Sequence, residues 1–415
     1  MLNIVRQRLF ADGLLARADF RRYWASSIAT SFGGQVGGLA IPLCAALMLQ
    51  ATPAQMGILG AWQALPFALL ALPAGVWLDR SRKLPILLGS KILQGTALAS
   101  IPLAWWLGLL TMHWLYAVGA IMGACSVVGG AAEQMLLTFM VGRDRLIDAH
   151  AKFTLSDSMA RVTGPGLAGL LVQALTAPIA VLVDAIGVLL SGWMLGGIKV
   201  TEPAPTPLDQ HPLADIRDGL RFIWQTPLLR TLIVAVGGWH IFLYATNALQ
   251  IVFATRVLGM SPGVLGAANM IGGLGALASS LLIKPLSDRF GAGKTILIGL
   301  WSTTVSFLLI PLIPAQLPAT PILYGLAIFA YDCGVFIFLL PYVALRQKVT
   351  PDAMLGRMIS TSRFLTVGSA PLGALAGGYL GDAIGIRDAM LAVALASALL
   401  CVAVSTSRTI RSVRP

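Results

Sequence analysis

Apolar runs of about twenty residues recur twelve times along this chain of 415 residues, separated by short polar connections. A helix of that length crosses roughly 30 Å of hydrocarbon. The composition agrees, because 57% of the residues are hydrophobic and 11% are charged, against roughly 25% charged in soluble domains. These runs exclude a water-soluble globule and predict an all-α membrane protein, with spans at about residues 23–49, 56–78, 85–108, 114–141, 158–176, 178–198, 231–255, 263–283, 295–313, 320–345, 364–381 and 389–406.

The lysines and arginines are divided unequally between the two ends of these spans. Of the 29, 25 fall in the termini and in alternate connections, while Arg256 and Arg387 fall on the opposite side and Lys91 and Arg161 lie within spans. Because cytoplasmic loops carry the excess of positive charge, we expect a multi-pass protein of the inner (cytoplasmic) membrane with both termini in the cytoplasm. The net charge of +12 is thus a topology signal, and no basic run interleaved with aromatic residues indicates nucleic-acid binding.

Matched segments at a nearly constant offset divide the chain into halves of six spans each. Asp79-Arg80 recurs as Asp288-Arg289, and Pro165 recurs as Pro371, at offsets of 209 and 206 residues. Such offsets are typical of transporters built from two repeats. We expect an N-terminal amphipathic segment (1–22), a six-helix bundle (23–198), a cytoplasmic linker (199–229), a second six-helix bundle (230–406) and a basic tail (407–415).

The sequence does not carry the motifs expected for ATP hydrolysis or for a metal site. Residues 291–295 end in Gly-Lys-Thr, but Asp288 stands where a phosphate-binding loop has its first glycine. The four cysteines lie singly in apolar runs and the four histidines are far apart, so we expect no metal site and no cofactor. The alternative among enzymes is a membrane-embedded transferase that uses His211 and Asp215. A channel is not supported, because the sequence has no ring of charges and no filter sequence.

The connection between the second and third spans resembles the GxLaDrxGRrr motif of the major facilitator superfamily. Its matching residues are Gly75, Asp79, Arg80, Arg82 and Lys83. The resemblance implies a cytoplasmic latch, in which the glycine lets helices approach, the aspartate accepts hydrogen bonds at a helix N-terminus and the basic side chains meet acidic partners or lipid headgroups. The motif lacks its second glycine, and its copy near Asp288 has Lys284 in place of the leading glycine. The alternative is that the basic residues only set the topology.

The fifth span resembles the antiporter motif that exporters of this family carry. Its matching residues are Arg161, Gly164, Pro165, Gly166 and Gly169. Pro165 removes a backbone donor and kinks the helix, and the glycines make a flat surface for the facing half. The resemblance associates this surface with export, and a simple proline kink is the alternative. Segments beginning at Val141, His211, Gly219 and Thr350 are similar to the enterobactin-exporter and macrolide-efflux branch.

Ionisable residues within the spans are candidates for ion coupling, because a charge at mid-membrane costs roughly 2.5 to 3.5 kcal/mol on insertion scales. Glu133, Asp184 and Asp332 are the proton-coupling candidates, since a carboxyl group in a low dielectric favours its neutral form and releases the proton when the site hydrates. The alternative is a structural ion pair, for example Glu133 with Lys91 or Arg161. Polar and aromatic residues at mid-span are the substrate-cavity candidates: Gln35, Gln63, Trp239, His240, Tyr244, Asn247, Tyr331 and Phe336.

The resemblance covers nearly the whole chain and implies twelve transmembrane helices in two pseudo-symmetric six-helix bundles. The predicted function is secondary active export of a small amphiphilic molecule, a siderophore or a drug such as a macrolide, by alternating access with proton antiport. The expected partners are the small-molecule substrate, protons and the lipid bilayer, and we expect a monomer. A proton-coupled or facilitative importer of a small nutrient is the alternative among transporters.

Overall fold

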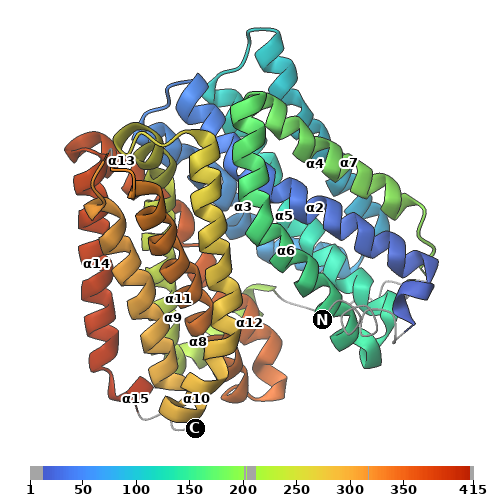
Figure 1. Ribbon diagram of the computed structural model, residues 1–415. Coiled ribbons are helices and arrows are strands. Elements are labelled where there is room, and N and C mark those ends of the chain that lie inside the picture. The colour runs from blue at the N-terminus through green and yellow to red at the C-terminus, as the bar shows by residue number, and fades with distance from the viewer. Residues whose placement is uncertain (1–12, 201, 203–211, 316, 412–415) are drawn as a thin grey trace.

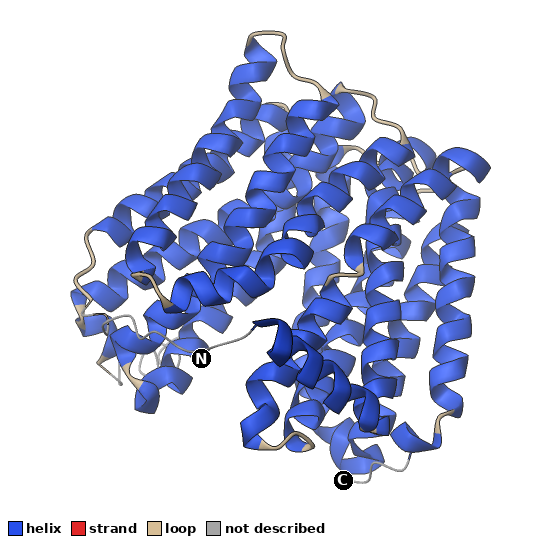
Figure 2. Cartoon of the chain, turned by 180° about the vertical axis from the view of Figure 1, so that it is seen from behind, coloured by secondary structure: helices blue, strands red, loops and turns tan. Residues whose placement is uncertain are grey.

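The computed structural model describes residues 13–200, 202, 212–315 and 317–411. Within these residues the chain forms helices and loops, without a strand (Figure 2). Part of the predicted N-terminal segment (1–12), of the linker (201 and 203–211) and of the tail (412–415) lies outside the described residues, and so does His211.

The helices of the N-terminal half follow the predicted spans closely, except that α6 begins at Leu146, twelve residues before the predicted start of its span at residue 158. A short 3₁₀ turn (Leu14–Ala16) precedes α2 and a π turn (Cys44–Met48) follows it. The helices are α2 (Ala18–Leu43), α3 (Pro53–Asp79), α4 (Lys83–Trp106), α5 (Met112–Val141), α6 (Leu146–Ala174) and α7 (Ala177–Gly196). The start of α3 has a local cause, because Thr52 and Gln55 form a reciprocal capping box at its first turn.

The C-terminal half follows an amphipathic linker helix, α8 (Pro212–Gln225), which packs against the second helix bundle. A π turn (Phe253–Val257) extends the first helix of this half. The helices are α9 (Pro227–Val252), α10 (Pro262–Leu312), α11 (Thr320–Lys348), α12 (Asp352–Val367), α13 (Ala370–Ile384), α14 (Ile386–Thr406) and the short α15 (Arg408–Arg411).

In the C-terminal half, the structure joins two predicted spans and divides another. The predicted eighth and ninth spans are joined in α10, because residues 284–294 are helical except for a bend at Gly291, where φ is 80°; only glycine adopts this conformation readily. The predicted eleventh span is divided between α12 and α13 at Gly368 and Ser369, where Pro371, which has no backbone N–H, sits in the first turn of the next helix.

The span count is nevertheless twelve. In the described residues, nine helices are long and apolar enough to cross a membrane. One of these, α10, is 51 residues long and carries two of the predicted spans. The remaining two spans are α6, which contains several charged residues, and the divided α12–α13 pair.

The two halves meet at one side of the molecule and diverge toward the other (Figure 1). We call the side where α2 begins and α14 ends the terminal side, and the opposite side the distal side. A single buried apolar cluster on the distal side includes residues from both halves, such as Val36 and Leu249. On the terminal side each half has apolar clusters of its own, so the distal side is the joined one.

Glycines allow the two halves to approach at the backbone. Helix α6 of the N-terminal half packs on α10, and α3 packs on α13. A Cβ atom added to Gly169 would lie 2.9 Å from Cα of Gly266, and one added to Gly57 would lie 2.9 Å from Cα of Gly378. Small residues of this kind let membrane helices gain packing contacts that larger side chains would prevent.

Candidate transport pathway and coupling residues

A cavity of about 400 Å³ lies between the halves, on the terminal side of their glycine contacts. Helices α2, α3 and α6 contribute one wall and α9 and α10 the other. Its lining residues carry no formal charge and combine amides, one phenol and apolar groups: Gln35, Gly38, Leu39, Pro42, Met56, Leu59, Gly60, Gln63, Pro165, Tyr244, Asn247, Ala248, Gln250, Ile251 and Asn269. Such a lining suits a molecule with both apolar and hydrogen-bonding parts.

Four of the eight predicted cavity residues line this cavity, namely Gln35, Gln63, Tyr244 and Asn247. Asn269 and Met56 were not predicted, because a lone asparagine or methionine in a glycine- and alanine-rich span carries no distinctive signal. Gln250 also contributes, and its amide donates a hydrogen bond of 2.8 Å to the Tyr324 hydroxyl.

The other four predicted cavity residues lie elsewhere in the described structure. Trp239 is buried in the C-terminal bundle, with its ring centroid 4.9 Å from that of Phe338. Five residues separate it from Tyr244, which rotates it by about 140° around the helix. His240 Nδ1 lies 2.9 Å from the Val236 carbonyl oxygen, and the Tyr331 ring packs against Phe307. The fourth, Phe336, lies beside an arginine of the other half.

Hydrogen bonds between the halves close the distal side. The Gln173 side-chain oxygen accepts bonds from the Gly263 amide, at 2.8 Å, and from the Ser261 hydroxyl, at 3.2 Å. The Thr52 hydroxyl donates to Asp382 at 3.1 Å. The Arg256 guanidinium donates to the Ala46 carbonyl at 2.9 Å. We call these contacts, together with the α6–α10 and α3–α13 glycine pairs, the distal seal.

Two exposed arginines extend from one half toward an aromatic ring of the other. The Arg161 guanidinium of α6 lies 5.9 Å from the centroid of Phe336 on α11. The Arg363 guanidinium of α12 lies 5.4 Å from the centroid of Phe67 on α3. Their exposure, together with that of Asp157, indicates that solvent reaches the space between the halves from the terminal side.

The glycines and proline of the predicted antiporter motif face the opposite half or the cavity. Pro165 lines the cavity. A Cβ atom added to Gly164 would meet the Gln35 side chain at 2.5 Å, and one added to Gly166 would meet the Met270 sulfur. Gly169 belongs to the distal seal. The glycines of the motif therefore lie where α6 makes two close contacts. One is with the cavity residue Gln35 of α2, and the other is with helix α10 of the opposite half.

The predicted latch motif lies at the turn between α3 and α4 on the terminal side. Gly75 has open space around the position that a Cβ would take, and the side chain of Asp79 lies outside the described residues. Arg80 and Arg82 are exposed, whereas Lys83 is buried with its ammonium 5.9 Å from the Phe139 ring centroid.

A linker residue that sequence reasoning missed caps the helix that follows this turn. The Glu202 carboxylate accepts hydrogen bonds from the backbone amides of Lys83 and Leu84, the latter at 2.9 Å. Since acidic groups are stabilising at helix N-termini, this contact ties the linker to the first turn of α4. No local sequence signal marks it, because the partners are 118 residues apart.

We expect Glu202→Ala to lower the free energy of unfolding by about 1 kcal/mol, as loss of a helix cap does. The measurement is thermal unfolding of the purified protein in detergent. Asp144→Ala, at an exposed residue near α6, is the control and should leave the midpoint unchanged. Equal midpoints for wild type and Glu202→Ala would show that the cap does not stabilise α4.

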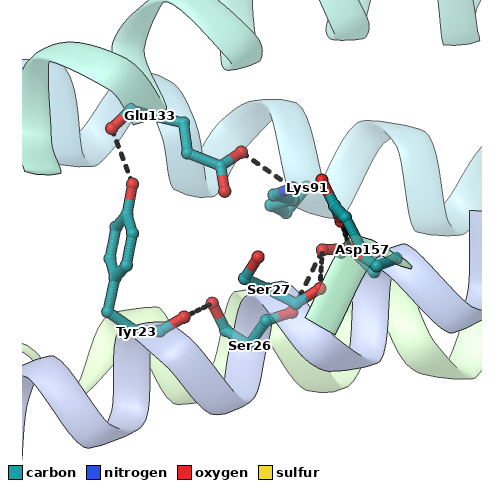
Figure 3. A network of polar contacts seen from close by, with 8 residues as sticks. Tyr23, Ser26, Ser27, Lys91, Glu133 and Asp157 are labelled. Carbon is teal, nitrogen blue, oxygen red and sulfur yellow. Dashed lines mark hydrogen bonds and ion pairs between the residues drawn. The ribbon is translucent and has the colours of Figure 1, made fainter. Parts of the chain in front are cut away.

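Polar side chains form a network inside the N-terminal bundle (Figure 3). Lys91 Nζ of α4 lies 3.5 Å from Glu133 Oε2 of α5, and their side chains are 11% and 31% exposed. The Tyr23 hydroxyl of α2 donates to the Glu133 backbone carbonyl at 2.6 Å. Nearby, the Ser31 hydroxyl donates to Asp157. The ion pair of Glu133 with Lys91 was one of the two pairings considered from the sequence, and Arg161 instead faces Phe336.

The other two predicted coupling residues differ in their surroundings. Asp184 of α7 is 1% exposed, and neither carboxylate oxygen has a hydrogen-bond partner among the described residues. It packs against Gly33 and Gly37 of α2. Asp332 of α11 is half-buried beside Gly272 of α10.

Within the described residues, no three histidines, cysteines or acidic residues come together as metal ligands would.

Comparison with known proteins agrees with this architecture. The chain is 28% identical over 348 residues to the multidrug efflux pump Tap of Mycolicibacterium fortuitum, covering 81% of this chain and 83% of the pump. It is 30% identical over 267 residues to the enterobactin exporter EntS of Shigella flexneri, covering 63% and 62%.

Structural similarity extends over nearly the whole chain. A mutant of the nucleoside transporter NupG superposes with a TM-score of 0.78 at 12% identity, covering 94% of this chain and 99% of that one. The sequence profile of the Major Facilitator Superfamily matches residues 23–366 and again 241–413. The chain therefore belongs to the Major Facilitator Superfamily and is a multi-pass membrane transporter rather than an enzyme.

Proposed function

We propose that this transporter exports a small amphiphilic molecule, a siderophore or a drug such as a macrolide, by alternating access. The observation that carries the proposal is the cavity between the halves, which is uncharged, mixes amides with apolar groups and is closed on the distal side. The printed functions of the relatives, a multidrug efflux pump and an enterobactin exporter, favour the same direction of transport. The small residues of the α6 motif support it as well.

The proposal includes an orientation. The terminal side carries nearly all lysines and arginines, so we assign it to the cytoplasm of a bacterial inner membrane, with both termini there. In this orientation the structure is open to the cytoplasm and ready to receive substrate. Residues 23–198 and 230–406 act as the two moving halves, residues 199–229 connect them, and one copy of the chain suffices.

Protons are the proposed coupling ion. Asp184 is a buried carboxyl group and Asp332 a half-buried one, and removal of a carboxyl group from water favours the neutral acid over the anion. Each can therefore carry a proton in one conformation and release it in the other. Exchange of cytoplasmic substrate for external protons uses the gradient that bacterial inner membranes maintain.

We expect Asp79→Asn to abolish transport while leaving the amount of protein in the membrane unchanged. The resemblance assigns Asp79 to a latch that holds the cytoplasmic side closed, and an amide lacks the negative charge that favours a helix N-terminus. The measurement is substrate uptake normalised to the protein detected in the membrane. Arg82→Lys preserves the positive charge and is the control. Transport by Asp79→Asn at the wild-type rate would remove the latch.

The function itself is tested by uptake into inverted inner-membrane vesicles of a catecholate siderophore, a macrolide and a lipophilic cation. The proposal expects accumulation of one of these probes in vesicles containing the transporter, and not in vesicles from cells that lack it. Uptake of a probe by intact cells that depends on the transporter, without uptake by inverted vesicles, would establish import instead.

A further inference from the structure

The cavity between the halves contains polar side chains that are available for hydrogen bonding. Of its six, the Gln250 amide donates to the Tyr324 hydroxyl. The side chains of the other five have no hydrogen-bond partner within the described residues. A side-chain amide has two N–H donors and a carbonyl acceptor, and a phenol hydroxyl both donates and accepts, so a bound molecule can use these groups. The five available groups belong to Gln35, Gln63, Tyr244, Asn247 and Asn269.

Glycines of neighbouring helices hold the stems of the two glutamines. A Cβ atom added to Gly164 of α6 would lie 2.5 Å from Cβ of Gln35, and one added to Gly119 of α5 would lie 3.0 Å from Cγ of Gln63. Because both stems pack closely against a neighbouring helix, each amide has fewer orientations to lose when it binds a molecule. The two amides are therefore partly preorganised for binding.

The available groups come from both walls of the cavity. Helices α2 and α3 of the N-terminal half carry the two glutamines, whereas α9 and α10 carry the tyrosine and the two asparagines. The volume of about 400 Å³ is within the usual range for small-molecule sites, roughly 300–1,000 Å³. A molecule that bonds to both walls therefore needs several hydroxyl, amide or ester groups distributed around an apolar frame.

The charged side chains of the neighbouring helices are directed elsewhere. Asp184 contacts α2 at two glycines that are each two residues from Gln35, and therefore about 200° around the helix from it. Asp332 lies on α11, which contributes no lining residue. The Arg161 guanidinium lies 5.9 Å from the centroid of the Phe336 ring. The lining itself therefore has no charge that could neutralise a bound ion.

Alternating access gives a physical reason for selection against charge. Closure of the terminal side around a substrate removes water from the cavity, so the lining must then match every polar group of the substrate. Hydroxyl, amide and ester groups can exchange water for the available side chains, but a charge without a counter-ion is strongly disfavoured there. Aromatic faces would stabilise a cation, and the lining has a single aromatic ring, that of Tyr244.

We propose that the cavity selects uncharged molecules with several hydrogen-bonding groups, such as hydroxylated macrocyclic esters, and rejects molecules that carry a permanent charge. The five available side chains are the specificity-determining groups. This inference rests on the proposed function and narrows its substrate class. A basic drug binds as its free base, after the proton of its ammonium group has passed to water and the electron pair has stayed on nitrogen. A catechol siderophore binds in its iron-free, uncharged form.

The test is equilibrium binding of radiolabelled probes to the purified full-length protein in detergent. One pair is a macrolide with a tertiary amine and the same macrolide methylated to a quaternary ammonium, compared at a pH where the amine is mostly uncharged. The other pair is an iron-free catechol siderophore and its anionic ferric complex, compared near neutral pH. The charged member of each pair should bind roughly tenfold or more weakly, because the lining cannot neutralise it.

Variants of the lining should reverse the selection. Gln63→Glu places a carboxylate in the cavity with little change of shape, so the dissociation constant of the quaternary macrolide should fall to that of its parent or below. Gln134→Glu is the matched control, because Gln134 is exposed on α5 and does not line the cavity; it should keep the wild-type ratio of the two constants. Asn247→Asp, at an exposed position of the opposite wall, is the second variant and should also lower this ratio.

Equal affinity of the wild type for both macrolides, an unchanged ratio in both lining variants, or no binding of either uncharged probe would overturn the inference. Export and selectivity can fail separately. Export of the lipophilic cation by inverted vesicles would support the proposed function and remove this inference alone. Selective binding without export would support the selectivity and count against the proposed function.

Discussion

Gly169→Leu is expected to reduce transport roughly ten- to a hundred-fold. A Cβ atom at this position would lie 2.4 Å from the Pro262 carbonyl oxygen and 2.9 Å from Cα of Gly266. These are backbone atoms that cannot rotate away. Overpacking of this kind costs about 1–3 kcal/mol, and 1.4 kcal/mol is a factor of ten in a conformational equilibrium. Since the clash exists only while the distal seal is closed, the variant should favour the conformation open on the distal side.

The measurement combines uptake with accessibility. A cysteine is introduced at the cavity residue Asn269, both in the wild-type background and in Gly169→Leu. A membrane-impermeant thiol reagent added from the distal side should react with this cysteine in Gly169→Leu and should not react with it in the wild-type background. Gly130→Leu is the matched control, because Gly130 of α5 is exposed and has open space around the added Cβ. Wild-type uptake by Gly169→Leu, or equal reactivity of the two cysteine variants, would mean that the α6–α10 contact does not govern distal closure.

Asp184→Asn is expected to abolish accumulation of substrate against a gradient while preserving exchange of substrate across the membrane. Asparagine has the shape of a protonated aspartate and remains neutral in every conformation. The transporter would therefore pass between its conformations without carrying a proton. Accumulation should fall to the level of protonophore-treated wild-type vesicles, whereas counterflow of labelled against unlabelled substrate should continue.

Asp157→Asn is the control for this experiment. Its carboxylate is exposed and accepts the Ser31 hydroxyl, so its replacement should leave accumulation intact. Full accumulation by Asp184→Asn would return Asp184 to a structural role. Loss of both accumulation and counterflow, with the protein folded, would also contradict the prediction, because it would show that Asp184 is needed for more than proton coupling.

The helical architecture was predictable because hydrophobic length is a local property. Runs of apolar residues marked each span, and most of their ends agreed with the helices. The exceptions are the starts of α6 and α12, each twelve residues before the predicted start, and the boundaries at Gly291 and at Gly368–Ser369, which depend on how two successive segments pack. The positive residues predicted a common side for the chain ends, and α2 begins and α14 ends on one side. Neither signal requires knowledge of which helices touch.

The candidate site was predictable only in part, because its residues are assembled from distant segments. Trp239, His240, Tyr244 and Asn247 were all predicted to line the cavity, but Trp239 lies too far around α9 to share it with Tyr244. Gly33 and Gly37 lie four residues apart in the sequence, a spacing that lets membrane helices approach closely. That Gly33 and Gly37 receive Asp184, a residue some 150 positions later, depends on the α2–α7 contact.

The account's central claim is that substrate leaves the cytoplasm in exchange for protons. The most direct measurement uses de-energised inverted vesicles loaded with ammonium chloride and diluted into ammonium-free buffer, which acidifies the lumen, with the transported probe outside. The account predicts transient accumulation of the probe after dilution, abolished by a protonophore and absent when ammonium is present on both sides. Accumulation that is the same with and without the imposed gradient would contradict proton antiport.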